Sequence, residues 1–311
     1  MAIHWTIIHN PQSCSGRGAK HWSEIERLLK AAGIQFTAFH TEHAGHAIAL
    51  TRDAIRNGGR HFVAVGGDGT FNEVLNGIFG QADVPSTDIV LSQIPIGTGN
   101  DWRRTMHIPK DYAACTQLLL DWHELRQDVG VVEWDERGTT QRRYFGNVAG
   151  MGFEAAVGIK ANADKAAGKG GLLGYIPALL GILSRYKATN AAFTVDGKRL
   201  AARNFFTLAI GICKFNGGGM QQCPAALYDD GLFDLTVINE VPKWVVIANF
   251  PRIFTGAFVK IKYVEQHRAS TITVTAGPET LLEVDGENIG QGTARFTILP
   301  KALRVATVDA N

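Results

Sequence analysis

Short apolar runs alternate with stretches of helical spacing over residues 2–96 of this 311-residue chain. The apolar runs lie at 2–8, 34–39, 61–65 and 89–96. Apolar side chains recur at helical spacing between them, and the first two helices are followed by glycine, at Gly33 and at Gly58. Strands that alternate with helices of this length predict a parallel sheet with helices on both faces. The N-terminal part is therefore expected to be an α/β domain.

After about residue 128 the pattern changes to strand-like runs that follow one another closely. Two-residue turn pairs separate several of these runs and predict hairpins, namely Arg137-Gly138, Asp196-Gly197 and Asp285-Gly286. Helical stretches at about 152–187 and 242–258 interrupt the strands. The chain is long enough for two domains at roughly 150 residues each. We expect an α/β domain over 1–134 and a second, mostly antiparallel domain over 135–297.

Composition argues against several classes of protein. Hydrophobic residues make up 45% and charged residues 19%, so the chain can form ordinary cores, and a net charge of +2 gives no support for nucleic-acid binding. The N-terminus has no basic region or cleavage site typical of a secretory signal. The longest apolar run, 172–183, falls short of the ~20 residues that span a bilayer. The four cysteines lack zinc-ligand spacing, so we expect free thiols and a cytoplasmic protein.

The most informative motif is a glycine-rich turn between the third strand and the helix after it. It comprises Gly66, Gly67, Asp68, Gly69 and Thr70. Glycines let the backbone approach a phosphate closely, and the free amides at a helix start attract anions. The motif therefore predicts a phosphate-binding loop. Thr70 and Glu73 also have the spacing of a helix capping box, which is a structural explanation for both.

Asp68 is a carboxylate inside this predicted phosphate loop, where it would repel a phosphate unless a cation lay between them. Mg²⁺ is commonly held by one or two carboxylates together with phosphate oxygens. The structural alternative is an aspartate that bonds the backbone of its own turn. A second glycine turn follows the fourth strand and comprises Gly97, Thr98, Gly99, Asn100 and Asp101. Parallel strands end at one edge of a sheet, so both turns are expected to hold the same ligand, a nucleotide.

Together these motifs resemble the catalytic core of the diacylglycerol and sphingosine kinases, most of all the small bacterial lipid kinases. The resemblance runs in order along nearly the whole chain, through 10–13, 41–47, 66–77, 97–101, 147–153, 224–234 and 284–287. It implies an N-terminal α/β domain with a Rossmann-like parallel sheet and a C-terminal antiparallel β-sandwich. It also implies that residues 298–311 return to the first domain.

The resemblance further implies a kinase that uses ATP and Mg²⁺ to phosphorylate a lipid hydroxyl, in a cleft between the two domains. The residues implied to bind the nucleotide are Asn10, Pro11, Gln12, Ser13, Thr41, Gly66, Gly67, Asp68, Gly69, Thr70, Glu73, Gly97, Thr98, Asn100 and Asp101. Asp68 is also a candidate metal ligand, Asp230 is implied to bind a structural metal, and Asp285 is implied to be the general base. The residues alone favour a simpler role for Asp285, as the first residue of a hairpin turn.

Two further patterns have both a functional and a structural explanation. His40, His43 and His46 invite a metal site, but their spacing does not bring three imidazoles to one helix face, so we expect a structural role. The stretches 172–183 and 241–264 are apolar and flanked by basic residues, which suits a membrane surface, although core helices explain them equally well. Membrane docking would place the protein peripherally at the inner face of the membrane, next to its lipid substrate.

Two other functions share parts of this pattern. Soluble-substrate kinases of the NAD kinase or phosphofructokinase type share the Gly-Gly-Asp-Gly-Thr turn, although the patterns at 284–287 and 230–231 argue against them. A non-enzymatic nucleotide- or lipid-binding protein is the second alternative, and the intact Asp68, Asp101 and Asp285 argue against it. The sequence leaves open which lipid is the acceptor and whether the chain forms a homodimer.

Overall fold

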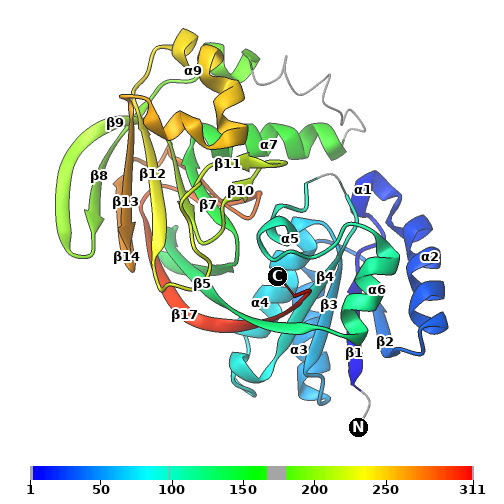
Figure 1. Cartoon of the computed structure of the whole chain (residues 1–311). Coiled ribbons are helices and arrows are strands. Elements are labelled where there is room, and N and C mark those ends of the chain that lie inside the picture. Colours follow the sequence, from blue (N-terminus) through cyan, green and yellow to red (C-terminus); the bar gives the residue numbers. More distant parts are fainter. Residues whose placement is uncertain (1–2, 98, 167–179, 310–311) are drawn as a thin grey trace. The chain divides into compact units, whose positions relative to one another are not determined.

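The computed structural model describes residues 3–97, 99–166 and 180–309 (Figure 1). The chain divides into two compact units, which we describe separately. Unit 1 comprises residues 1–129 and 300–311, and unit 2 comprises residues 130–299. The chain passes from one unit to the other within two long strands, β5 (His123–Glu136) and β17 (Ala294–Thr307).

A parallel sheet with the strand order β2, β1, β3, β4 forms the centre of unit 1. The four predicted strands are confirmed as β1 (His4–His9), β2 (Gln35–His40), β3 (His61–Gly66) and β4 (Val90–Pro95). The end of β17 runs parallel to β4, with Arg304 opposite Val90. Strands β1, β3 and β4 are buried along nearly their whole length, as expected for parallel strands covered on both faces.

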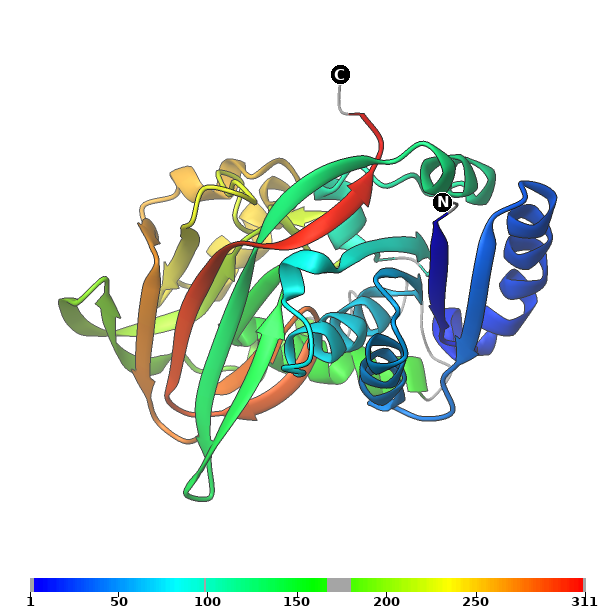
Figure 2. The same ribbon diagram turned by 90° about the horizontal axis from the view of Figure 1, so that it is seen from below.

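Helices cover both faces of this sheet (Figures 1 and 2). One face carries α2 (Gly18–Ala31) and α6 (Tyr112–Leu120), and the other carries α3 (His46–Arg56) and α4 (Asp68–Phe79). The connections contain the short helices α1 (Ser13–Gly16), η1 (Ser86–Asp88) and α5 (Asp101–Thr105). Because all four strands run in the same direction, the loops that follow them gather at one edge of the sheet.

Unit 2 is built mainly from antiparallel strands. They are β6 (Thr139–Phe145), β7 (Val148–Gly152), β8 (Thr189–Val195), β9 (Lys198–Gly211), β10 (Phe215–Asn216), β11 (Met220–Gln221), β12 (Phe233–Asn239), β13 (Val264–Ala269), β14 (Thr271–Ala276), β15 (Leu281–Val284) and β16 (Glu287–Gln291). Five fully buried phenylalanines contribute to the core of this unit: Phe145, Phe193, Phe205, Phe233 and Phe296. The expected pair of an α/β domain and an antiparallel β-sandwich domain is confirmed.

The three predicted turn pairs each close a hairpin with a two-residue turn. Both central residues have positive φ: +54° and +82° at Arg137-Gly138, +45° and +79° at Asp196-Gly197, and +49° and +82° at Asp285-Gly286. Positive φ at both positions is typical of a type I′ turn, whose twist matches that of the flanking strands. These turns join β5 to β6, β8 to β9, and β15 to β16.

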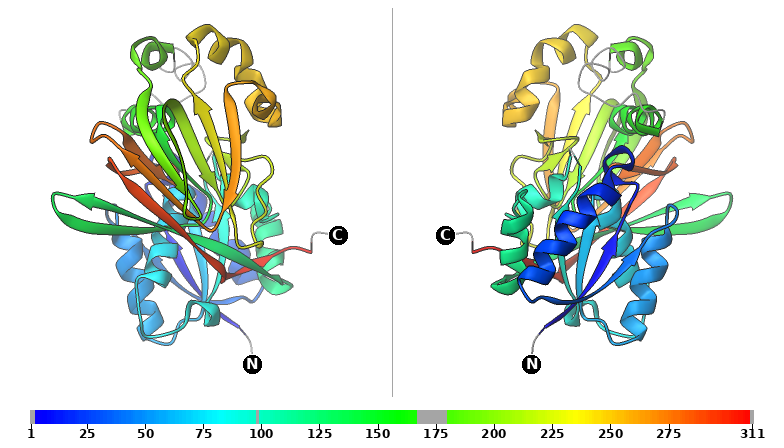
Figure 3. Two further views of the ribbon diagram at one scale, coloured as in Figure 1. Left: turned by 90° about the vertical axis from the view of Figure 1, so that its left-hand side faces the viewer. Right: turned by 90° about the vertical axis from the view of Figure 1, so that its right-hand side faces the viewer.

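The helices of unit 2 lie in the two predicted helical stretches, except that the last one continues two residues beyond 258. The first stretch contains α7 (Phe153–Ala166), and the second contains α9 (Lys243–Asn249), η2 (Phe250–Thr255) and η3 (Ala257–Lys260). The second group lies at one end of unit 2, drawn in gold in Figure 3. Most of the apolar run 172–183 falls outside the described residues. Among the described residues no helix is long and apolar enough to cross a membrane.

Candidate active site

The two glycine loops start side by side at the carboxyl edge of the sheet in unit 1. Strands β3 and β4 pair in parallel with Gly66 opposite Pro95, so the loops leave the sheet at the same level. Gly66 has no room for a side chain, because a Cβ there would lie 2.3 Å from Thr70 Oγ1. Gly97 has φ +140°, a conformation that other residues rarely adopt. Thr98 lies outside the described residues.

Asp68 connects the two glycine loops. Its Oδ2 accepts a hydrogen bond from the backbone N–H of Asn100 at 2.8 Å, and its Oδ1 accepts one from that of Asp101 at 2.9 Å. The side chain also stands in the first turn of α4, where a negative charge is favourable. Both partners belong to the second loop and not to the turn that contains Asp68. The carboxylate therefore fixes the position of one loop relative to the other.

The loops after β1 and β2 reach the same edge of the sheet. Asn10 donates from Nδ2 to Thr70 Oγ1 at 3.2 Å, and its Oδ1 accepts the backbone N–H of Gln12 at 2.9 Å. The backbone N–H of Thr41 donates to His9 O at 2.9 Å. Ser13 is buried, and its Oγ has no hydrogen-bond partner among the described residues. Four of the loops implied to bind nucleotide are thus neighbours within one unit.

The predicted capping box of Thr70 and Glu73 is wrong. Helix α4 begins at Asp68 with Gly67 as its N-cap, three residues earlier than a box with Thr70 as N-cap requires, and it has no side-chain cap. Glu73 instead accepts the backbone N–H of Gly45 at 2.8 Å and that of Ala47 at 3.1 Å. Its carboxylate therefore holds the start of α3, and no ligand is needed to explain it.

The second glycine loop contains oxygen atoms suited to a hard cation. Asn100 Oδ1 is buried and has no hydrogen-bond partner among the described residues. Asp101 is buried beside it and accepts a hydrogen bond from Arg104 Nε at 3.1 Å. With Asp68 these side chains offer only oxygen atoms, the donors that Mg²⁺ prefers, and phosphate oxygens normally complete such a site. The residues present therefore fit a magnesium–nucleotide complex.

Asp285 lies in unit 2, at the first position of the turn between β15 and β16. The side chain is 3% exposed. Oδ1 accepts the backbone N–H groups of Asn147 at 3.0 Å and Val148 at 3.2 Å, and Oδ2 accepts that of Gly146 at 3.2 Å. Bonds of this kind favour the ionised carboxylate. The turn role that the residues alone suggested is present, and the role of general base stays a prediction.

Asp230, the implied ligand of a structural metal, forms an ion pair with Arg268. Its Oδ1 also accepts the backbone N–H of Leu232 at 3.0 Å, and Arg268 Nε lies 3.4 Å from Asp234 Oδ2. The guanidinium supplies positive charge to both carboxylates. In the part of the chain that the structure describes, no group of three His, Cys, Asp or Glu side chains could hold a metal ion. The implied site would use one carboxylate completed by neighbouring backbone carbonyls, so the structural metal at Asp230 stays a prediction.

The three histidines at 40–46 do not converge. His40 Nδ1 lies 2.9 Å from His9 Nδ1, whereas the rings of His43 and His46 stack on each other with centroids 4.8 Å apart. Burial, followed by the electrostatic effect of the neighbouring His40, lowers the pKa of His9 to about 4. The expected structural role of these side chains is consistent with both contacts.

A pair of glutamates in unit 2 was not predicted. Glu283 is 2% exposed, and Asn216 Nδ2 donates both to Glu283 Oε1 at 3.3 Å and to Glu154 Oε1. A Cβ at Gly150 would lie 2.8 Å from Glu154 Oε2, so glycine leaves the space that the pair occupies. Burial and the neighbouring Glu154 raise the pKa of Glu283 well above its usual value. Burial was not visible in the sequence, which is why the pair was missed.

The glutamate pair predicts an unusual dependence of stability on pH. An unfolded glutamate loses its proton near its ordinary pKa of 4.5, whereas the folded pair keeps a proton to higher pH. The folded state then binds more protons, so its stability falls as pH rises, by up to about 1.4 kcal/mol per pH unit. Glu283→Gln should therefore raise the melting temperature at about pH 8 and change it little at about pH 4. The exposed Glu136→Gln is the control, and an equal gain at both pH values would contradict the assignment.

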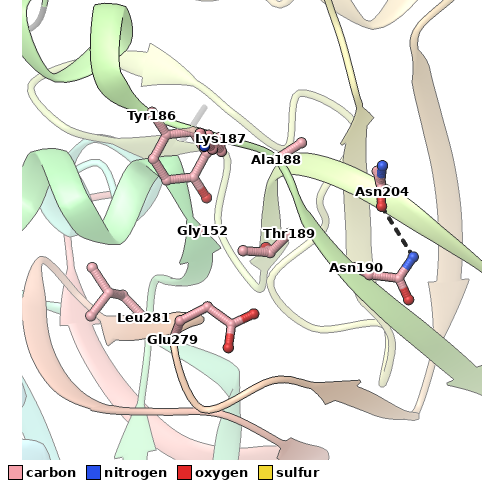
Figure 4. A pocket seen from close by; sticks show the side chains of 9 residues that line it. All are labelled: Gly152, Tyr186, Lys187, Ala188, Thr189, Asn190, Asn204, Glu279 and Leu281. Atoms are coloured by element: carbon pink, nitrogen blue, oxygen red, sulfur yellow. Dashed lines mark hydrogen bonds between the residues drawn. The ribbon is translucent and has the colours of Figure 1, made fainter.

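A pocket of about 440 Å³ also lies in unit 2 (Figure 4). Its lining comes from separate segments and includes Gly152, Tyr186, Thr189, Asn204 and Leu281. Asn190 Nδ2 donates to Asn204 Oδ1 at 3.1 Å on one wall. Burial raises the pKa of Tyr186 to about 12, so its hydroxyl stays a hydrogen-bond donor at neutral pH. No sequence motif joins these segments, so the pocket was not predicted.

Comparison with known proteins gives two family matches. Residues 4–132 match the diacylglycerol kinase catalytic domain, and residues 147–307 match the YegS C-terminal NAD kinase beta sandwich-like domain. A diacylglycerol kinase of Mycobacterium tuberculosis is 30% identical over 301 residues, covering 96% of this chain and 94% of that protein. One of Staphylococcus haemolyticus is 28% identical over 305 residues, covering 97% and 87%.

A solved structure shares the fold. The crystal structure of a diacylglycerol kinase from Bacillus anthracis matches with a TM-score of 0.70 at 20% identity, covering 99% of this chain and 97% of that one. The match extends over both units, as do the sequence relatives. The chain therefore belongs to the diacylglycerol kinase family and is a lipid kinase.

Proposed function

We propose that this protein transfers the γ-phosphoryl group of ATP, as its magnesium complex, to the hydroxyl of a diacylglycerol-like lipid at a membrane surface. The observation that carries the proposal is the carboxylate of Asp68, which joins the two glycine loops through Asn100 N and Asp101 N. Relatives named diacylglycerol kinases support this acceptor.

The glycine loops would hold the phosphates. Glycines in both loops let the backbone approach a phosphate closely, and the N-terminus of α4 contributes a partial positive charge. Magnesium, when bound, would neutralise phosphate charge, with Asp68, Asp101 and Asn100 as its nearest oxygen donors. Catalysis of phosphoryl transfer rests mainly on such positioning and charge neutralisation.

Asp285 would act as the general base. The acceptor oxygen forms a bond to the γ-phosphorus while the bond to the leaving ADP oxygen breaks, and the hydroxyl proton passes to the carboxylate. Three backbone N–H groups favour the ionised form of this carboxylate and fix its orientation. A fixed, ionised base suits this task because the geometry of proton transfer is narrow.

A panel of acceptors tests the proposal. The protein, magnesium and γ-labelled ATP are incubated separately with diacylglycerol, phosphatidylglycerol and sphingosine in mixed micelles, and with NAD and fructose 6-phosphate in solution. We expect label in the diacylglycerol product. Label in NAD or the sugar phosphate would favour a soluble-substrate kinase, and label in inorganic phosphate alone would contradict phosphoryl transfer to any of these acceptors.

A further inference from the structure

The segment 241–264 of unit 2 concentrates positive charge. It contains Lys243, Arg252, Lys260 and Lys262 and no aspartate or glutamate, so its net charge is +4, whereas the whole chain has +2. All four basic residues are exposed. Lys243 Nζ donates to the backbone oxygen of Ser184, and Arg252 donates to Asn249 Oδ1 at 3.1 Å. Within the described part of the chain, none of the four pairs with a carboxylate.

Helix α9, which begins this segment, is apolar on both faces. Val245 is buried, and Val246 packs on the apolar cluster of Phe153, Leu183 and Phe206. Trp244 and Ile247 are three residues apart and so lie on one side of the helix, where they are 71% and 53% exposed. The inner face is explained by the core of unit 2. Packing within the unit does not explain the outer face.

Single exposed apolar residues are ordinary, so the clustering is what matters. Eight large apolar side chains are exposed among the described residues, and three of them, Trp244, Ile247 and Phe254, lie within eleven consecutive positions, 244–254. Trp244 and Phe254 are the two aromatic members of the eight. Aromatic side chains beside lysine and arginine are the combination found where proteins rest on a lipid surface.

We propose that α9, η2 and η3 form a membrane-docking face that binds an anionic lipid bilayer. The face lies at one end of unit 2 (Figures 1 and 3). Trp244, Ile247 and Phe254 would enter the interface while the basic side chains contact lipid phosphates. A second copy of the chain is a poorer occupant, because two such faces would repel each other. The proposal extends the proposed function, since a membrane lipid is the expected acceptor.

Tryptophan fluorescence can report contact at this face. Trp244 is 71% exposed, whereas Trp5, Trp102 and Trp134 are buried. Vesicles that contain phosphatidylglycerol should shift the emission of the full chain to the blue, and brominated acyl chains should quench it. Trp244→Phe keeps an apolar side chain and should remove most of both signals while vesicles still pellet the protein. A wild-type signal in this variant would place the contact elsewhere and overturn the proposal.

Two double variants test apolar and electrostatic contacts separately by vesicle co-sedimentation. Trp244→Ser with Ile247→Ser should weaken binding about tenfold or more, since each large apolar side chain contributes strongly when buried. Lys260→Glu with Lys262→Glu should also weaken vesicle binding, by about fivefold for each basic residue removed near an anionic surface. Leu120→Ser, at an exposed apolar residue of unit 1, and Lys198→Glu with Arg199→Glu in the β8–β9 hairpin are the controls.

The outcomes separate this proposal from the proposed function. With a short-chain diacylglycerol that dissolves in water, the docking variants should keep the wild-type kcat/KM. With long-chain diacylglycerol in anionic vesicles, their kcat/KM should fall in proportion to their loss of vesicle binding. If the docking variants and the controls weakened vesicle binding equally, the proposed docking face would be wrong. Concentration-dependent dimerisation that buries Trp244 would also overturn it, in favour of a second copy. No turnover of either lipid by the wild-type protein would instead reject the proposed function.

Discussion

Asp68→Ala is expected to lower kcat/KM about 10²–10³-fold, because it removes charge stabilisation from the phosphate site. It should also lower the melting temperature, since the amides of Asn100 and Asp101 lose their acceptors. Asp68→Asn retains one acceptor oxygen and so should recover part of the stability. It cannot restore the negative charge, so the magnesium concentration needed for half-maximal activity should stay raised.

Asp111→Ala is a matched control for this experiment. Asp111 is also a carboxylate at a helix N-terminus in unit 1, where it accepts the backbone N–H of Ala114 at 2.9 Å. Its loss should cost about 1 kcal/mol of stability and leave activity unchanged. If Asp68→Asn restored both stability and magnesium dependence, Asp68 would only connect the loops and would have no part in binding the metal–nucleotide complex.

Asp285→Asn is expected to lower kcat about 10²–10⁴-fold, the usual effect of losing a general base. The affinity for ATP should change little, since the nucleotide loops belong to the other unit. Asparagine and aspartate have nearly the same size, but the hydrogen bonds of Asp285 predict that this variant also loses stability. The amide NH₂ of asparagine cannot accept a hydrogen bond, so at least one of the three backbone N–H groups loses its partner, at about 1–3 kcal/mol.

Asp196 provides the control that this stability cost requires. It also begins a type I′ turn in unit 2, and its carboxylate accepts the backbone N–H groups of Ser270 at 3.0 Å and Thr271 at 2.8 Å. Asp196→Ala removes the acceptor of both N–H groups and should therefore destabilise the protein while kcat stays near the wild-type value. If the two variants lost stability and kcat in the same proportion, Asp285 would be a structural turn residue and the assignment of the base would be wrong.

The strands and hairpin turns could be predicted because residues that are close together in the sequence determine them. The four strands of unit 1 follow from apolar runs that alternate with stretches of helical spacing, and the three hairpins follow from residue pairs that tolerate positive φ. The same reasoning failed at Glu73, where the spacing of a capping box was present but the helix began at Asp68. Because the helix starts three residues earlier, the Glu73 carboxylate accepts hydrogen bonds from the start of α3 instead.

The contacts in the candidate site were harder to predict because they join distant segments. The partners of Asp68 lie more than thirty positions away, at Asn100 and Asp101, and no local pattern records that connection. Arg268 pairs with Asp230 across thirty-eight positions, a contact that no local pattern predicts. The Glu154–Glu283 pair depends on burial, which periodicity does not reveal.

Transfer of label from γ-labelled ATP to diacylglycerol in mixed micelles tests the central claim most directly. With the wild-type protein and magnesium, we expect label to move into the organic phase as the phosphorylated lipid. Transfer should stop when magnesium is chelated and should fall by the predicted factors in Asp68→Ala and Asp285→Asn. Wild-type transfer in both variants, or no label in the lipid under any of these conditions, would contradict the account.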